Sequence, residues 1–193
     1  MAREFEILRS YHLKTGSSFN RPIQVLSDVS FNDPAISVMT DLSKVSMVVA
    51  RPNASMDSAN AKMIRYGVRM LLVLDTNDHI AGLLTATDIL GEKPMRFLQN
   101  MGGSHADIMV RDLMTPQREL EVMKIEDVKN ADVGQIVATL KKAGRQHGLV
   151  VAEGADGKQT VCGIFSVTQI ARQLQLELAE MFAEVEAIVS HSN

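Results

Sequence analysis

The stretch Gly82-Leu83-Leu84-Thr85-Ala86-Thr87-Asp88 has a similar counterpart later in the chain, Gly163-Ile164-Phe165-Ser166-Val167-Thr168-Gln169. Two other landmarks recur upstream in the same order, a Met-Thr pair and a glycine that opens an apolar strand: Met39-Thr40 and Met114-Thr115, Gly67 and Gly144. Half of a small domain exposes too much apolar surface to be stable alone. The duplication therefore predicts two copies packed about a pseudo-twofold axis, with a central cleft and two related pockets.

Hydrophobic periodicity predicts the same order of elements in both copies: strand, helix, strand, strand, helix. The expected strands are 45–50, 70–74 and 80–84 in the first copy and 120–125, 147–152 and 160–165 in the second. Ser55 is expected to cap the first helix and Gly67 to end it, while the matching helix begins at Asn130 or Asp132 and ends at Gly144. The fold class is therefore α/β, of the α+β type.

The order of the landmarks also predicts how the chain is divided. We expect an N-terminal extension (1–34), a first repeat (35–100), a linker (101–110), a second repeat (111–175) and a C-terminal helix (176–193). Residues 167–189 contain no Gly or Pro, so they predict one long helix or two abutting helices.

The end of the chain carries an apolar stripe of the coiled-coil type: Leu174, Leu178, Met181, Val185 and Ile188. This stripe predicts a homodimer. A helix that packs on the core of its own chain needs a similar stripe, so that alternative stays open.

Composition limits the classes of function. The chain has 193 residues, of which 46% are apolar and 22% charged, and its net charge is −3. Nucleic-acid binding depends on clustered Lys and Arg, so this charge argues against it. No apolar run approaches the ~20 residues that span a bilayer. The single cysteine, Cys162, and a start that lacks the apolar core of a signal peptide predict a cytoplasmic protein.

The sequence contains none of the common motifs for catalysis or metal binding. A phosphate-binding P-loop, a GxGxxG turn after a strand and an HExxH or CxxC metal pattern are all missing. We therefore expect neither an enzyme nor a metal site.

The repeated stretch places two polar groups where a strand ends and a helix begins. Thr85 and Asp88 are three residues apart, so they share one face of the first helical turn. Asp88 offers two acceptor oxygens that can take both hydroxyls of a ribose, and Thr85 can donate to a phosphate or sugar oxygen. Alternatively, the two residues form only a capping box for the helix.

Together, the duplicated Met-Thr pairs, the Gly-led hairpins and the pattern Gly-x-x-Thr/Ser-x-x-Asp/Gln resemble the cystathionine-β-synthase (CBS) domain family over roughly residues 35–178. Tandem CBS repeats are called Bateman modules. The resemblance implies a flattened two-repeat disc that binds an adenosine-containing ligand (AMP, ADP, ATP or S-adenosylmethionine) in its cleft. It also implies a sensor or regulatory role, without catalysis, for a partner protein that the sequence does not identify.

Carried over by residue, Thr85 and Asp88 match the ribose and phosphate contacts of the family. Ser166 matches the hydroxyl of the second copy, but Gln169 stands where the family has Asp. A neutral amide has one acceptor oxygen, so the second pocket is expected to be empty, altered or specific for another group.

Basic residues after the repeated glycines are further candidates for ligand contacts, because the family often directs such residues toward phosphates. Arg69 holds such a position in the first copy, and Arg145 and His147 in the second. Arg69 can equally be an exposed strand residue, and His147 a strand histidine with its bonds satisfied. The leading hypothesis is thus a sensor of an adenosyl ligand; the alternative is a ligand-free scaffold that dimerises and binds a protein.

Overall fold

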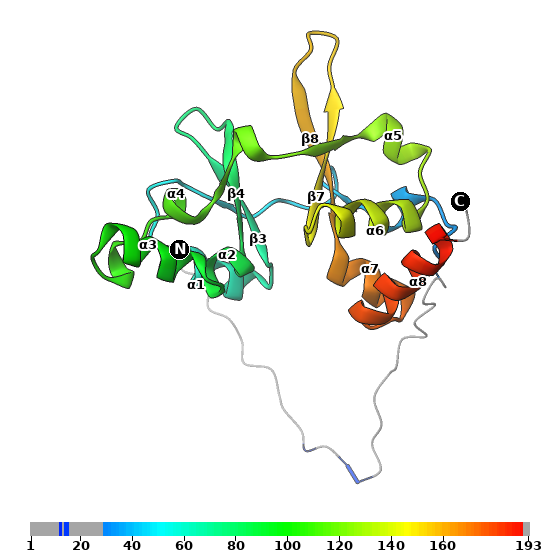
Figure 1. Cartoon of the computed structure of the whole chain (residues 1–193), viewed down its shortest axis with the longest axis horizontal. Helices are drawn as coiled ribbons and strands as arrows, with labels where there is room; N and C mark the ends of the chain where they lie inside the picture. Colours follow the sequence, from blue (N-terminus) through cyan, green and yellow to red (C-terminus); the bar gives the residue numbers. More distant parts are fainter. Residues whose placement is uncertain (1–11, 13, 16–28, 191–193) are drawn as a thin grey trace, which may run out of the picture.

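In the computed structural model, residues 12, 14, 15 and 29–190 are described, the last three by their backbone only. They form two four-stranded sheets with the strand orders β2-β3-β4-β5 and β1-β8-β7-β6. The sheets stand side by side, and α1, α2, α7 and α8 all lie at the end opposite the hairpin tips (Figure 1). We call the sheet β2-β3-β4-β5 with α1 to α4 the first lobe, and the other sheet with α5 to α8 the second lobe. This confirms the expected fold class.

The first lobe is built around one hairpin. Its elements are β2 (Val49–Ala50), α1 (Met56–Tyr66), β3 (Met70–Leu74), β4 (Ile80–Thr85), α2 (Ala86–Leu90), α3 (Lys93–Met101), α4 (Val110–Leu113) and β5 (Thr115–Pro116). The side chain of Ser55 accepts a hydrogen bond from the Ser58 amide and so caps α1, as expected. Gly67 ends the helix with a φ of 63°, in the left-handed region that glycine adopts without strain.

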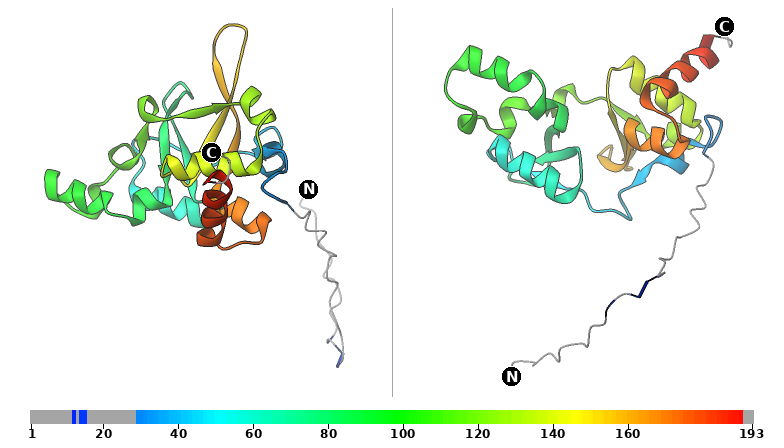
Figure 2. Two further views of the ribbon diagram at one scale, coloured as in Figure 1. Left: turned by 45° about the vertical axis from the view of Figure 1, so that its right-hand side comes forward. Right: turned by 90° about the horizontal axis from the view of Figure 1, so that it is seen from below.

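The second lobe repeats this plan. Its elements are η1 (Ala35–Val38), β1 (Thr40–Asp41), β6 (Val122–Lys124), α5 (Ile125–Lys129), α6 (Val133–Lys142), β7 (His147–Glu153), β8 (Gln159–Ser166), α7 (Val167–Leu174) and α8 (Leu178–Ser190). Of two further short helices, η2 (His105–Asp107) lies between α3 and α4 of the first lobe, and η3 (Gln117–Glu119) lies between β5 and β6, in the connection between the lobes. Figure 2 shows the two lobes side by side when the molecule is seen from below.

The two hairpins have the same register. Met70 pairs with Thr85 and His147 with Ser166, and both ladders shift at the same place, after Val73 and after Val150. This register makes Asp88 of α2 the counterpart of Gln169 of α7. The duplication in the sequence is therefore a duplication of backbone structure.

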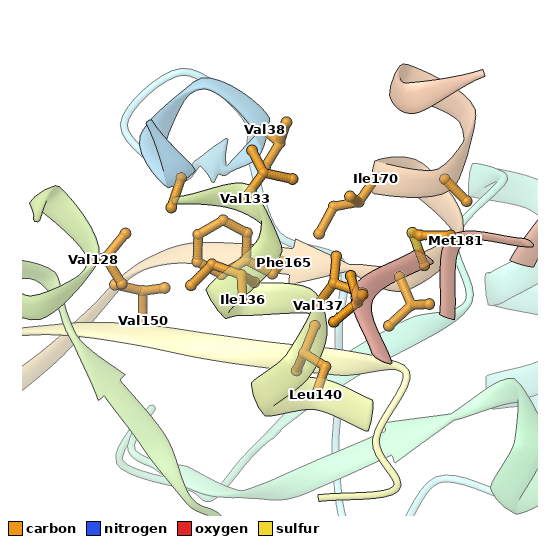
Figure 3. Close-up of a cluster of buried hydrophobic side chains, with 14 residues drawn as sticks. Val38, Val128, Val133, Ile136, Val137, Leu140, Val150, Phe165, Ile170 and Met181 are labelled. Carbon is orange, nitrogen blue, oxygen red and sulfur yellow. The ribbon is translucent and has the colours of Figure 1, made fainter. Parts of the chain in front are cut away.

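Each lobe borrows a segment from the other half of the sequence. The early strand β1 pairs with β8, and the late strand β5 pairs with β4. Ala35 and Val38 are buried in the core of the second lobe, where Val38 lies with Val133, above Phe165 (Figure 3). In the same way, Val110 and Leu113 are buried in the core of the first lobe. The two Met-Thr landmarks lie within these exchanged segments, where the short helix passes into the short strand.

The repeated glycines are explained by the exchange. A Cβ on Gly82 would lie 2.5 Å from the Thr115 carbonyl oxygen and 2.9 Å from the Met114 sulfur. A Cβ on Gly163 would meet the sulfur of Met39. Each glycine therefore makes room for the methionine of the borrowed segment.

The lobes meet through a third apolar cluster. Its buried members are Met70, Leu72, Leu83, Leu149 and Ile164, which come from the two hairpins. Because both hairpins contribute, this cluster joins the lobes directly, in addition to the exchanged segments.

Several element boundaries differ from the sequence prediction. The strands expected at 45–50 and 120–125 are only Val49–Ala50 and Val122–Lys124. The helical region after Val167 is two helices, because Gln175 takes a left-handed conformation with a φ of 59°. Most of the expected N-terminal extension (1–34) lies outside the described residues.

The predicted terminal stripe is divided between α7 and α8 rather than lying along one helix. Met181 and Val185 are buried in the core of the second lobe, at 0% and 3% exposure. At these two positions the alternative interpretation, a helix packed on its own chain, is correct. The side chain of Ile188 lies outside the described residues. A search of the described helices for one long and apolar enough to cross a membrane finds none.

Candidate functional site

A cavity of about 270 Å³ lies between the lobes. The first lobe contributes Leu83, Thr85, Thr87 and Asp88, at the end of β4 and the start of α2, and Thr115 of β5. The second lobe contributes Glu121, Gly144, Arg145, Gln146 and His147, mainly from the loop between α6 and β7. The structure thus brings together four of the predicted site residues: Thr85, Asp88, Arg145 and His147.

Thr85 and Asp88 form the capping box of α2. The Asp88 Oδ2 atom accepts hydrogen bonds from the Thr85 amide and hydroxyl, both at 2.7 Å, and the Thr85 hydroxyl accepts one from the Asp88 amide at 3.3 Å. The side chain of Asp88 is 12% exposed. The capping role is therefore present, and both residues also line the cavity, so the two interpretations are compatible.

Asp88 has a partner that the sequence reasoning missed. The Lys93 ammonium group lies 2.6 Å from Asp88 Oδ1 and also donates to the Leu113 carbonyl oxygen at 2.9 Å. Lys93 is the first residue of α3, five positions after Asp88, and only the short turn after α2 brings its side chain back to the site. Lys93 belongs to no motif that we recognised in the sequence, so it was not predicted as a site residue.

The charges on the opposite wall are also paired. Arg145 lies 3.2 Å from the Glu121 carboxylate and donates to the backbone carbonyls of Glu121 and Glu119 at 3.4 and 3.5 Å. Glu121 was not foreseen as a site residue, because its position before β6 has no sequence signal. The cavity therefore carries two carboxylates, each with one cation.

His147 is the only histidine in this wall, within the described residues. Burial lowers the pKa of its imidazole below the ordinary 6.5, the positive charge of Arg69 lowers the pKa further, and Asp88 raises it. Its Nδ1 atom is buried and has no hydrogen-bond partner among the described residues. His147 is therefore neutral near pH 7, and its ring is not a strand histidine with both nitrogens satisfied.

The remaining predicted site residues, Arg69, Ser166 and Gln169, do not line this cavity. Arg69 is an exposed residue just before β3, and its positive charge lowers the pKa of His147. The Oε1 atom of Gln169 accepts a hydrogen bond from the Thr40 hydroxyl at 3.3 Å. The amide of Gln169 is thus engaged by the exchanged segment of the second lobe.

Comparisons with known proteins give a consistent result for the fold. Residues 35–94 match the family model of the CBS domain. An uncharacterized conserved protein from Pyrococcus horikoshii is similar in structure, with a TM-score of 0.53, 22% identity and coverage of 75% of this chain and 93% of that chain. CBSX2 from Arabidopsis thaliana, in a crystal structure with AMP, gives a TM-score of 0.51, 24% identity and coverage of 72% and 94%.

A putative archaeal homolog of g-AMPK from Methanocaldococcus jannaschii is similar at a TM-score of 0.51 and 16% identity, over 72% of this chain and 49% of that chain. At these identities the similarity shows the fold alone. A search of curated protein sequences finds no match.

Proposed function

We propose that the chain, which matches the CBS-domain model over residues 35–94 and shares the fold of CBSX2, is a regulatory sensor that binds an adenosine-containing ligand in the cavity between its lobes. The observation that carries this proposal is the position of Asp88. Its carboxylate lies at the first turn of α2 and lines a cavity whose other wall belongs to the second lobe. AMP, ADP, ATP and S-adenosylmethionine all offer a ribose with a hydroxyl group that can donate a hydrogen bond to such a carboxylate. The AMP complex of CBSX2, a protein of similar fold, supports this class of ligand.

The proposed mechanism is a population shift. A ligand that contacts Thr85 and Asp88 on one wall and Arg145 and His147 on the other binds best to one arrangement of the two lobes. The ligand therefore favours that arrangement, and a partner protein that binds the same arrangement is coupled to the ligand. We expect the protein to act through this coupling and not through catalysis.

Thermal unfolding in the presence of AMP, ATP or S-adenosylmethionine is the first test. A ligand present at about 100 times its dissociation constant stabilises the folded state by about 2.7 kcal/mol. The decisive variant is Asp88→Asn, which keeps the shape of the side chain and removes its charge. We expect it to weaken binding by about 1.5–3 kcal/mol in a calorimetric titration, the usual contribution of hydrogen bonds to a charged group.

Asp112→Asn is the matched control. Asp112 caps α4 through the Met109 amide at 2.8 Å, as Asp88 caps α2, and it lies outside the cavity wall. A specific role for Asp88 requires that Asp112→Asn leave the affinity unchanged. Equal losses in both variants would mean that capping alone is responsible.

A ligand-free scaffold is the second candidate function. It is favoured by the pairing of Asp88 with Lys93 and of Arg145 with Glu121, since charges that are already paired attract a ligand less. If none of the three ligands raises the unfolding temperature, this candidate replaces the sensor.

A homodimer also stays a prediction. Light scattering tests it directly. Any dimer has to form without Met181 and Val185, because both are buried within one chain.

A further inference from the structure

We infer that Lys93 is a specificity-determining residue of the cavity: its ammonium group compensates the charge of Asp88 and so allows a phosphorylated adenosyl ligand to bind beside that carboxylate. This inference rests on the proposed function and names the residue that selects among ligands of that class. It concerns a residue outside the repeated motif.

The first argument is the geometry of the ion pair. The Nζ atom of Lys93 lies 2.6 Å from Asp88 Oδ1, and Asp88 is 12% exposed while Lys93 is 46% exposed. A carboxylate with so little exposure is unfavourable without a counter-charge. The bond from Lys93 to the Leu113 carbonyl oxygen, at 2.9 Å, fixes the ammonium group from a second side. The pair is therefore held by α2, α3 and α4 together.

The second argument is the number of acceptor positions that remain. An ionised carboxylate has about four lone-pair sites. Two sites of Asp88 are used by the amide and hydroxyl of Thr85, and one is used by Lys93. About one site is left for a ligand hydroxyl, so Asp88 cannot accept both ribose hydroxyls in this arrangement. Ligand discrimination then depends more on the local charge than on a second hydrogen bond to Asp88.

The third argument is the charge balance of the cavity. A phosphate entering it meets the carboxylates of Asp88 and Glu121, and Arg145 is already paired with Glu121. The neutral His147 adds no positive charge near pH 7. Without Lys93, the carboxylate of Asp88 would lose its ion-pair partner and would repel an anionic ligand, because Arg69, whose charge also acts on His147, forms no ion pair with Asp88 among the described residues. A neutral nucleoside would not experience this repulsion.

The fourth argument comes from the second lobe. The shared hairpin register makes Gln169 the counterpart of Asp88, and the same spacing of five residues makes Leu174 the counterpart of Lys93. Leu174 packs against the core of its lobe, and Gln169 bonds Thr40. The carboxylate and the ammonium group are thus both present in one lobe and both replaced in the other.

The test compares AMP with adenosine, which differ in their phosphate, by calorimetric titration of Lys93→Met. We expect the affinity for AMP to fall about tenfold more than the affinity for adenosine, the scale of one unit charge acting over several ångströms near a protein surface. Lys93→Arg keeps the charge and should keep the wild-type ratio. Lys62→Met is the matched control, because the Lys62 ammonium group also donates to a carbonyl, that of Val49 at 3.0 Å, outside the cavity wall.

The double variant Asp88→Asn/Lys93→Met guards against loss of folding in the single variant. It removes both charges, like the Gln169 and Leu174 pair, and so leaves no buried charge unpaired. We expect the double variant to bind both ligands more weakly but to return the AMP-to-adenosine ratio to within about threefold of the wild-type value.

Equal weakening of both ligands by Lys93→Met would overturn the inference, because Lys93 would then act only by holding Asp88 in place. Tighter AMP binding would also overturn it, since Lys93 would then compete with the ligand. If the wild-type chain binds neither AMP nor adenosine, the inference is overturned, and the proposed function falls with it only if ATP and S-adenosylmethionine also fail to bind.

Discussion

The two lobes share one hairpin framework but differ in what covers their helices. In the second lobe, α8 packs on α6 and α7. Lys141 of α6 holds α8 in place, since its ammonium group lies 2.6 Å from the Glu186 carboxylate and donates to the Phe182 carbonyl oxygen at 3.0 Å. In the first lobe, the counterpart of Lys141 is Ile64, which is 73% exposed. Leu90, the counterpart of the buried Ala171, is 72% exposed.

This difference shows which parts of a duplicated fold are constrained. The sheets must match, because each lobe pairs its strands with a segment from the other half of the chain. The outer faces of the helices and the ends of α2 and α7 take no part in this strand pairing, so they can differ between the two lobes. One lobe has gained a helical cover, and the other has a charged pair beside a cavity.

The largest effect is expected from removing the core contact of α8. Met181 is fully buried, so Met181→Ala should lower the free energy of unfolding by about 2–5 kcal/mol. Ile64→Ala, on the uncovered face of the first lobe, should change it by less than about 0.5 kcal/mol. Urea unfolding of both variants measures this contrast. Similar losses would mean that the face of α1 is also covered in solution.

The glycines under the exchanged segments should give the next largest effect. Gly82→Ala places a methyl group against the backbone carbonyl of Thr115, which cannot move easily, and overpacking of this kind costs about 1–3 kcal/mol. Gly163→Ala meets only the flexible side chain of Met39, so it should cost less. Chemical denaturation can rank the two variants, and the reverse order would argue against the described packing of the two methionines.

The binding capacity of the two lobes should differ as well. We expect one adenosyl ligand per chain, because Gln169 replaces the carboxylate in the second lobe. Gln169→Asp should create a second site for adenosine that binds AMP about tenfold less well, since Leu174 supplies no counter-charge. Equilibrium dialysis gives the stoichiometry of both ligands. Two equal sites in the wild-type chain would refute the asymmetry.

The smallest effect concerns pH. Burial keeps the pKa of His147 below 6.5 in the folded chain, so the unfolded chain binds more protons at this residue as the pH falls. Stability should therefore be fully present above pH 6.5 and decrease as the pH falls below it. His147→Gln should make this decrease shallower, whereas His79→Gln, at a 78% exposed side chain, serves as the control. Parallel pH profiles of the wild-type chain and His147→Gln would contradict the prediction.

The hairpins and helix caps could be predicted from the sequence because their signals are local. Strand β3 was expected at 70–74 and lies at Met70–Leu74, bounded by Gly67 on one side and by a turn of Asp and Asn on the other. The exchange of β1 and β5 could not be predicted. Each strand has two residues, and Thr40 finds its partner at Ile164, far along the chain.

The candidate site could likewise be predicted only where its sequence signal is local. The repeated motif pointed to Thr85 and Asp88. A Thr-x-x-Asp helix cap is common on its own, but its recurrence at the same place in the second copy marked these two residues as candidates for the site. Lys93 and Glu121 were missed because their contribution depends on how a turn and a loop bring their side chains back to the cavity. The position of α8 was missed for a similar reason, since an apolar stripe does not say which surface it covers.

The exchanged segments have a consequence for how such a protein can be assembled. A chain that carried one repeat alone would lack the strand and the buried residues that the other half supplies. It could complete its core only by trading segments with a second copy, as domain-swapped dimers do. Joining two copies in one chain makes that trade intramolecular, so its completion no longer depends on protein concentration. Two fragments made by cutting the chain between α3 and α4, near η2, should for the same reason recognise and complete each other.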